Sequence, residues 1–149
     1  MSRRILVLAL TVSIGAGVWQ AGEARRKKPG EPDRVVVQHL LLSFKGAEDA
    51  RNKERSKKEA KALAETLLQR ARDGEDFDAL VKEHTDDRYP GIYTMTNYGV
   101  SAGARESERE GMVPAFGDVA FSLGVGELGL AEYHAALSPY GYHVIRRIE

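Results

Sequence analysis

The chain has 149 residues, with 22 basic and 22 acidic side chains, 42% apolar residues and no cysteine. This apolar fraction supports a hydrophobic core and argues against a disordered chain. Zero net charge argues against nucleic-acid binding, which normally needs a basic excess. Without cysteine there is no disulfide, thiolate zinc site, thiol nucleophile or lipoprotein anchor. The length fits one domain, alone or with a short appendage.

The first 24 residues have the layout of a secretory leader. Two arginines near the start precede an uncharged apolar stretch over residues 5–18, and the small residues Gly22 and Ala24 stand where a signal peptidase cuts. The apolar stretch is shorter than the roughly 20 residues that span a bilayer. We therefore predict a signal peptide over residues 1–24. An uncleaved leader that holds the protein at the membrane is the alternative.

A charged segment over residues 25–34 separates this leader from the first apolar run. It contains four consecutive basic residues and two prolines, and it has no hydrophobic periodicity. Such a composition predicts a flexible linker. We expect the folded domain to occupy residues 35–149.

The first half of that domain predicts one strand and two helices. Residues 35–44 are mainly aliphatic, as in a strand buried on both faces, and alternation puts His39 on the face opposite Leu40. Apolar residues at a spacing of three to four predict a helix over residues 48–72. A second helix is expected over residues 76–84, with the first residue as its N-cap.

The second half predicts strands around a third helix. Residues 92–98 are expected to form a strand, and the polar, Gly-rich residues 99–111 a loop. Pro114 suits the first turn of a helix. Two further strands are expected over residues 128–133 and 142–148. Mixed strands and helices without an internal repeat predict a small α+β domain.

Four segments, in this order, resemble the motifs of parvulin-type peptidyl-prolyl isomerases. They are residues 37–42 (VQHLLL), 76–87 (DFDALVKEHTDD), 112–127 (MVPAFGDVAFSLGVGE) and 141–145 (GYHVI). The resemblance implies a four-stranded, mainly antiparallel sheet surrounded by three to four helices. It also implies isomerisation of the bond before proline, with no cofactor and no metal.

The resemblance also implies which residues form the site. By motif, the catalytic positions fall on His39, Asp87 and His143, and the apolar proline pocket falls on Met112 and Phe116. Two further substrate-binding candidates are Tyr140 and Met95. The family's Gly-Gly-Asp-Leu-Gly segment, whose Leu helps line the pocket, is not recognisable here; residues 90–99 stand in its place.

Each of these residues also has a purely structural interpretation. Phe116 lies on a helical apolar stripe that predicts core packing, and histidines on strands are often hydrogen-bonded structural residues. His39 and His143 could be read as a zinc pair, but no third ligand stands at a diagnostic spacing. Asp87 could be a turn residue. Basic residues at 51–58 alternate with acidic ones, which predicts a solvated face rather than an anion site.

The sequence therefore predicts an exported peptidyl-prolyl isomerase of the periplasm or cell envelope. Its expected partners are proline-containing polypeptides, unfolded or nascent and themselves exported. Nucleic acid is not expected, and membrane contact is expected only if the leader stays uncleaved. A non-catalytic peptide-binding or chaperone module with the same fold is the main alternative, and an interaction domain held at the membrane is another.

Overall fold

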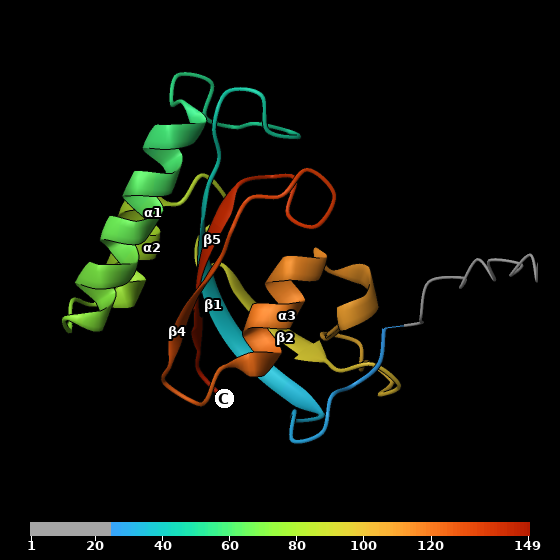
Figure 1. Ribbon diagram of the computed structural model, residues 1–149. Coiled ribbons are helices and arrows are strands. Elements are labelled where there is room, and N and C mark those ends of the chain that lie inside the picture. Colours follow the sequence, from blue (N-terminus) through green and yellow to red (C-terminus); the bar gives the residue numbers. More distant parts are fainter. Residues whose placement is uncertain (1–24) are drawn as a thin grey trace, which may run out of the picture.

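The centre of the structure is a twisted five-stranded sheet in the order β3-β2-β1-β5-β4 (Figure 1). The computed structural model describes residues 25–149, so the predicted leader lies outside the described residues. β2 and β3 are parallel, and every other neighbouring pair in the sheet is antiparallel. The strands are β1 (Arg34–Leu42), β2 (Ile92–Thr96), β3 (Ser107–Glu108), β4 (Leu128–Ala131) and β5 (Tyr142–Arg147).

Two helices pack on one face of the sheet and one helix packs on the other. α1 (Lys57–Arg72) and α2 (Phe77–His84) cover the first face, and α3 (Pro114–Ser122) covers the second (Figure 1). A short 3-10 helix, η1 (Arg109–Gly111), precedes α3. Among residues 25–149, no helix combines the length and apolarity needed to cross a membrane.

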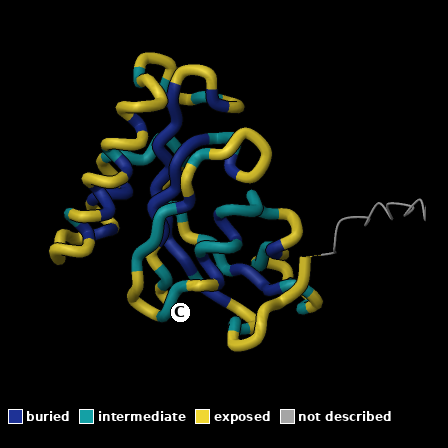
Figure 2. The backbone as a smooth tube through the Cα atoms, in the orientation of Figure 1, coloured by how far each residue is buried: buried dark blue, intermediate teal, exposed yellow. Residues whose placement is uncertain are grey.

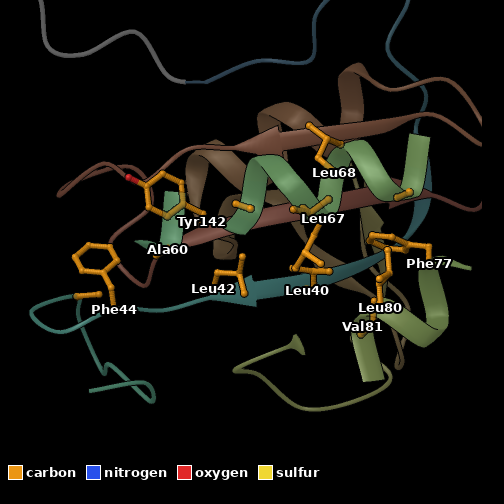
Figure 3. Close-up of a cluster of buried hydrophobic side chains, with 14 residues drawn as sticks. Leu40, Leu42, Phe44, Ala60, Leu67, Leu68, Phe77, Leu80, Val81 and Tyr142 are labelled. Atoms are coloured by element: carbon orange, nitrogen blue, oxygen red, sulfur yellow. The ribbon is translucent and has the colours of Figure 1, made fainter. Parts of the chain in front are cut away.

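β1 is buried on both faces and divides the hydrophobic core in two. Leu40 and Leu42 point into a cluster beneath α1 and α2 (Figure 3), whereas Val35 and Val37 point into a cluster beneath α3. Figure 2 shows the central strands in dark blue and most connecting loops in yellow or teal. His39 follows the alternation onto the α3 face. The predicted separation of His39 from Leu40 is thus observed.

The first helix begins later than we predicted. The structure starts α1 at residue 57 instead of 48, because Ser56 and Glu59 form a capping box: each side chain accepts a hydrogen bond from the other residue's backbone N–H. Residues 45–56 form a loop instead, in which Asn52 accepts hydrogen bonds from two later backbone N–H groups. By contrast, Asp76 caps α2 and Pro114 opens α3 as expected.

The sheet has a fifth strand where the sequence predicted only a loop. β3 lies within residues 99–111 and pairs Ser107 with Met95 and Glu108 with Thr96. The segment before β1 is also packed rather than free: Asn97 donates its backbone N–H to the carbonyl of Asp33 and its side-chain amide to that of Pro32. The α+β class is confirmed, with one more strand than predicted.

Candidate active site

A cavity of about 290 Å³ opens on the α3 face of the sheet. Its volume is at the small end of the range for ligand pockets, so it suits one side chain better than a large cofactor. Eleven residues from β1, β2, β5, α3 and four connecting segments line it: His39, Leu41, Asp49, Arg51, Asp87, Tyr93, Met112, Val113, Phe116, Tyr140 and His143.

The inner end of the cavity is aromatic and apolar. Phe116, from the first turn of α3, is only 2% exposed, and its ring stands edge-on to three others. The ring centroids of His39, His143 and Tyr93 lie 5.0, 5.4 and 5.9 Å away. These are ordinary separations for edge-to-face pairs. Met112 extends this apolar wall.

Two buried histidines form the polar floor. His39 in β1 and His143 in β5 have facing Nδ1 atoms 3.3 Å apart, and His39 Nε2 lies 3.6 Å from Asp87 Oδ2. A carboxylate only accepts, so His39 Nε2 carries the proton that faces it. His39 Nδ1 is then the acceptor and His143 Nδ1 the donor. We assign this single arrangement of donors and acceptors to the His–His–Asp row.

Backbone hydrogen bonds place Asp87 at the end of this row. Thr85 Oγ1 accepts from the N–H groups of Leu41 and Asp87, and Asp86 Oδ2 accepts from Ser43 N and from Arg55 Nη1. The Thr-Asp-Asp segment is therefore fastened along the end of β1. The Thr85 hydroxyl and the Asp86 carboxylate thus hold the segment that carries Asp87.

Asp87 is ionised over the whole physiological range of pH. Its interaction with His39 lowers the pKa of the carboxyl to about 2, opposed by partial burial and assisted by the N–H of Arg88 and the charge of Arg51. Arg51 Nη1 lies 3.3 Å from Asp87 Oδ1 and is half exposed at the cavity mouth. A fixed negative charge thus borders the polar end of the cavity.

A family model described as the PPIC-type PPIASE domain matches residues 23–149. The chain belongs to this family. The parvulin resemblance is thereby confirmed, and the histidines and carboxylate described above lie in a PPIC-type domain. The match begins before β1, in agreement with the packing of residues 31–33 against the sheet.

Two curated relatives have the names of folding factors. The chain is 36% identical over 125 residues to the Chaperone SurA of Chromohalobacter salexigens, covering 80% of this chain and 24% of that protein. It is 39% identical over 83 residues to the Foldase protein PrsA of Caldanaerobacter subterraneus subsp. tengcongensis, covering 56% of this chain and 24% of that protein. The chain therefore spans about a quarter of the length of these relatives.

Solved structures share the fold. The Peptidyl-prolyl isomerase ESS1 from Candida albicans superposes with a TM-score of 0.56 at 20% identity, over 78% of this chain and 63% of that chain. The PPIase domain of TBPAR42 gives a TM-score of 0.52 at 24% identity, over 77% of this chain and 99% of that chain. The architecture of this PPIC-type domain is thus the one found in these isomerases.

Of the seven site residues predicted from the sequence, six line one cavity of this PPIC-type domain: His39, Asp87, Met112, Phe116, Tyr140 and His143. The exception is Met95, which is fully buried in the core beneath α3 and does not line the cavity. Tyr93, two residues earlier on the same face of β2, lines it instead. Strand alternation would have offered Tyr93 as readily as Met95.

Within the described part of the chain, no group of three or more His, Asp or Glu side chains is arranged to hold a metal ion.

Burial of His143 predicts a loss of stability in acid. The pKa of His143 is lowered to about 3, chiefly by burial and also by the neighbouring His39, and Asp87 partly opposes this shift. An unfolded histidine titrates near pH 6.5. Between these values only the unfolded chain binds this proton, so the free energy of unfolding should fall as pH falls. This residue contributes a slope of up to about 1.4 kcal/mol per pH unit.

Urea unfolding at several pH values from neutral to about 4 measures this slope. His143→Asn should reduce this slope by the amount that corresponds to the uptake of about one proton on unfolding. His134→Asn is the control, because His134 lies in an exposed turn where its Nδ1 accepts from two backbone N–H groups. Equal slopes for the wild type and His143→Asn would contradict the assignment of a neutral, buried His143.

Proposed function

We propose that this domain catalyses cis–trans isomerisation of the peptide bond before proline in polypeptides. The observation that carries the proposal is the cavity itself, which joins an apolar aromatic end to a buried row of hydrogen-bonded histidines ending in an ionised carboxylate. The family and the named isomerases of the same fold support this assignment.

The reaction needs no covalent intermediate and no cofactor. Rotation about a peptide bond is resisted by about 18–20 kcal/mol of amide resonance. Resonance is lost in the twisted amide, so its nitrogen regains a lone pair and its carbonyl oxygen loses negative charge. An enzyme accelerates rotation by binding this twisted amide more tightly than the planar one.

The proposed roles follow from the two ends of the cavity. Met112 and Phe116 hold the proline ring in an apolar site, where Met adapts to ring pucker and the aromatic ring excludes water. The carbonyl that rotates then lies toward His39 and Asp87. Fixed dipoles and charge there distinguish the twisted from the planar amide without reorganising during the reaction.

Tyr140 and Tyr93 are proposed to flank the substrate chain. Tyr140 lies on the loop before β5 and Tyr93 lies on β2, and both line the cavity. Because β2 and β5 are the two neighbours of β1, the tyrosines approach the cavity from either side of β1. Tyr93 takes the place in the wall that we predicted for Met95. A tyrosine there supplies a large apolar face and a hydroxyl at its rim.

We place the substrates among exported polypeptides, in the periplasm or cell envelope. This part of the proposal relies on the leader-like composition of residues 1–24 and on similarity to proteins named chaperone and foldase. N-terminal sequencing of the protein recovered from the cell envelope tests it. A start near residue 25 supports a cleaved leader, and a start at Met1 supports an uncleaved anchor.

A protease-coupled assay on a short Ala-Pro peptide tests the catalytic proposal. The protease cleaves only the trans isomer, so an active domain increases the rate of the slow phase in proportion to its concentration. A slow phase that does not change with domain concentration would overturn the proposal.

The second candidate is a peptide-binding module without catalysis. It is favoured by the absence of the family's Gly-Gly-Asp-Leu-Gly segment, in whose place residues 90–99 stand, and by the chaperone name of one relative. In the same assay, this module would bind the peptide, as measured by fluorescence anisotropy, without increasing the rate.

A further inference from the structure

Arg109 is a buried cation that the proposed isomerisation chemistry does not use. It begins η1, and it is only 2% exposed. Removing a guanidinium from water is costly unless charged and hydrogen-bonding partners surround it. The position of Arg109 therefore depends on its partners more than on its own short helix.

Three distant parts of the chain hold this guanidinium. Nη1 donates to Glu31 Oε2 and to Asn97 Oδ1, both at 2.8 Å, and Nη2 donates to Asp118 Oδ1 at 2.9 Å. Two aromatic rings lie 4.6 and 4.7 Å from its Cζ atom, those of Tyr98 and Phe121. These distances are typical of cation–π contacts. Arg109 thus joins the segment before β1, the end of β2 and α3.

Glu31 is the partner from outside the predicted domain. Its side chain is only 8% exposed, and it also accepts from Lys28 N at 3.1 Å and from Asn97 Nδ2 at 3.2 Å. Burial raises the pKa of Glu31, but the bonds from Arg109, Lys28 and Asn97 outweigh it, so the pKa lies below its usual value. Figure 1 shows the segment in blue, between the grey trace and β1.

Arg109 borders both ends of the segment that forms the apolar wall. Its carbonyl accepts from Met112 N at 3.1 Å. On the other side, its Cγ lies 3.0 Å from where a Cβ on Gly117 would stand, directly after Phe116. Residues 112–116, which carry three cavity-lining side chains, therefore run between two contacts with the same buried side chain.

We propose that Arg109 is a positioning residue for the proline-binding wall, and that Glu31 makes the segment before β1 a working part of the site. Loss of the Glu31 charge leaves the guanidinium buried with a single anionic partner, and the wall shifts with it. The kinetic consequence rests on the proposed isomerase function, whereas the structural consequence is independent of it.

Glu31→Gln in the full chain tests the proposal. The chain has three methionines, Met1, Met95 and Met112, so methyl-13C-methionine labelling gives one reporter in the core and one in the wall. We expect the Met112 signal to move or broaden while the Met95 signal stays in place. We also expect kcat/KM to fall about tenfold, mainly through KM, as for a misplaced binding wall.

Asp33→Asn is the matched control in the same segment. Asp33 is exposed and paired with Lys27, and its side chain makes no contact with Arg109. This variant should keep the wild-type Met112 signal and KM. The comparison separates loss of a charge from loss of the particular charge that holds Arg109.

Gly117→Ala tests the contact between Arg109 and α3. Alanine favours helix more than glycine does, so a purely structural effect would maintain or raise the melting temperature. The new Cβ would instead press on the pinned stem of Arg109. We expect this overpacking to offset the gain in helix propensity, so that the melting temperature does not rise, together with a shifted Met112 signal and about a tenfold fall in kcat/KM.

Wild-type Met112 signals and KM values in both variants would overturn the inference. If Glu31→Gln loses the Met95 signal and hence its folded core, the result for Gly117→Ala alone supports or overturns it. An inactive wild type with shifted Met112 signals in both variants would refute the proposed isomerase while supporting the positioning role.

Discussion

Phe116→Ala is expected to abolish most of the activity, with kcat/KM falling at least about 100-fold. The ring of Phe116 meets both histidines and Tyr93 at 5.0–5.9 Å, so its removal opens the apolar end of the cavity to water. Without a dry, shaped site, the proline ring is held less firmly and the amide is no longer aligned with the His–His–Asp row. The protease-coupled assay measures this loss.

The same substitution should lower the free energy of unfolding by about 3–5 kcal/mol, the usual range for a buried Phe. Phe77→Ala is the matched control, because Phe77 is 1% exposed and lies in the core cluster on the opposite face of the sheet. It should be destabilised to the same degree, yet its folded molecules should keep wild-type kcat/KM. Phe116→Leu and Phe77→Leu repeat the comparison with smaller losses of stability.

Equal activity losses in the two phenylalanine variants would mean that Phe116 acts only through stability. That outcome would favour the core-packing interpretation of its helical stripe. The structure shows that the two interpretations are compatible, since Phe116 belongs to the core cluster beneath α3 and also lines the cavity.

The sequence predicted the helix starts and the strand faces that depend on residues close together in the chain. Asp76 caps α2 and Pro114 opens α3, because each satisfies or avoids unpaired N–H groups within one helical turn. Alternation placed His39 on the face opposite Leu40, and the register of β1 and β5 then brought His143 beside it. The start of α1 was missed although Ser56 and Glu59 carried a capping-box signal.

The remaining features depend on contacts between distant residues. β3 consists of two residues whose strand conformation follows from pairing with β2, and nothing in their own sequence marks them as a strand. Arg51 reaches Asp87 because residues 45–56 form a loop, whereas the sequence predicted a helix there. The sequence gives no sign that Arg109 is buried, because its partner Glu31 lies 78 positions earlier in the chain.

Asp87→Ala should lower kcat about 100-fold and change KM little, because the carboxylate touches the row that distinguishes the twisted amide and not the apolar wall. Asp73→Asn, at the exposed end of α1, is the control and should be silent. An unchanged kcat in Asp87→Ala would show that the charge is not used.

Asp87 should also contribute to stability with a defined dependence on pH. Its pKa is lowered from 3.8 to about 2, so its stabilisation is present above pH 3.8 and is lost as pH falls toward 2. Because solvent screens this partly exposed carboxylate, the shift corresponds to at most about 2 kcal/mol. Acid unfolding of Asp87→Ala should therefore lack this contribution, and unfolding curves above pH 4 should show the variant less stable by a similar amount.

Asp87→Asn separates the charge of Asp87 from the size and polarity of its side chain. The amide can turn its NH₂ group toward His39 Nε2, which removes the reason for that nitrogen to carry the proton and lets the row adopt the opposite tautomer. We therefore expect Asp87→Asn to be as slow as Asp87→Ala. In 15N spectra of the wild type, His39 should be protonated at Nε2 and His143 at Nδ1. Asp87→Asn should lose that preference, and an active Asp87→Asn with reversed tautomers would refute the assigned row.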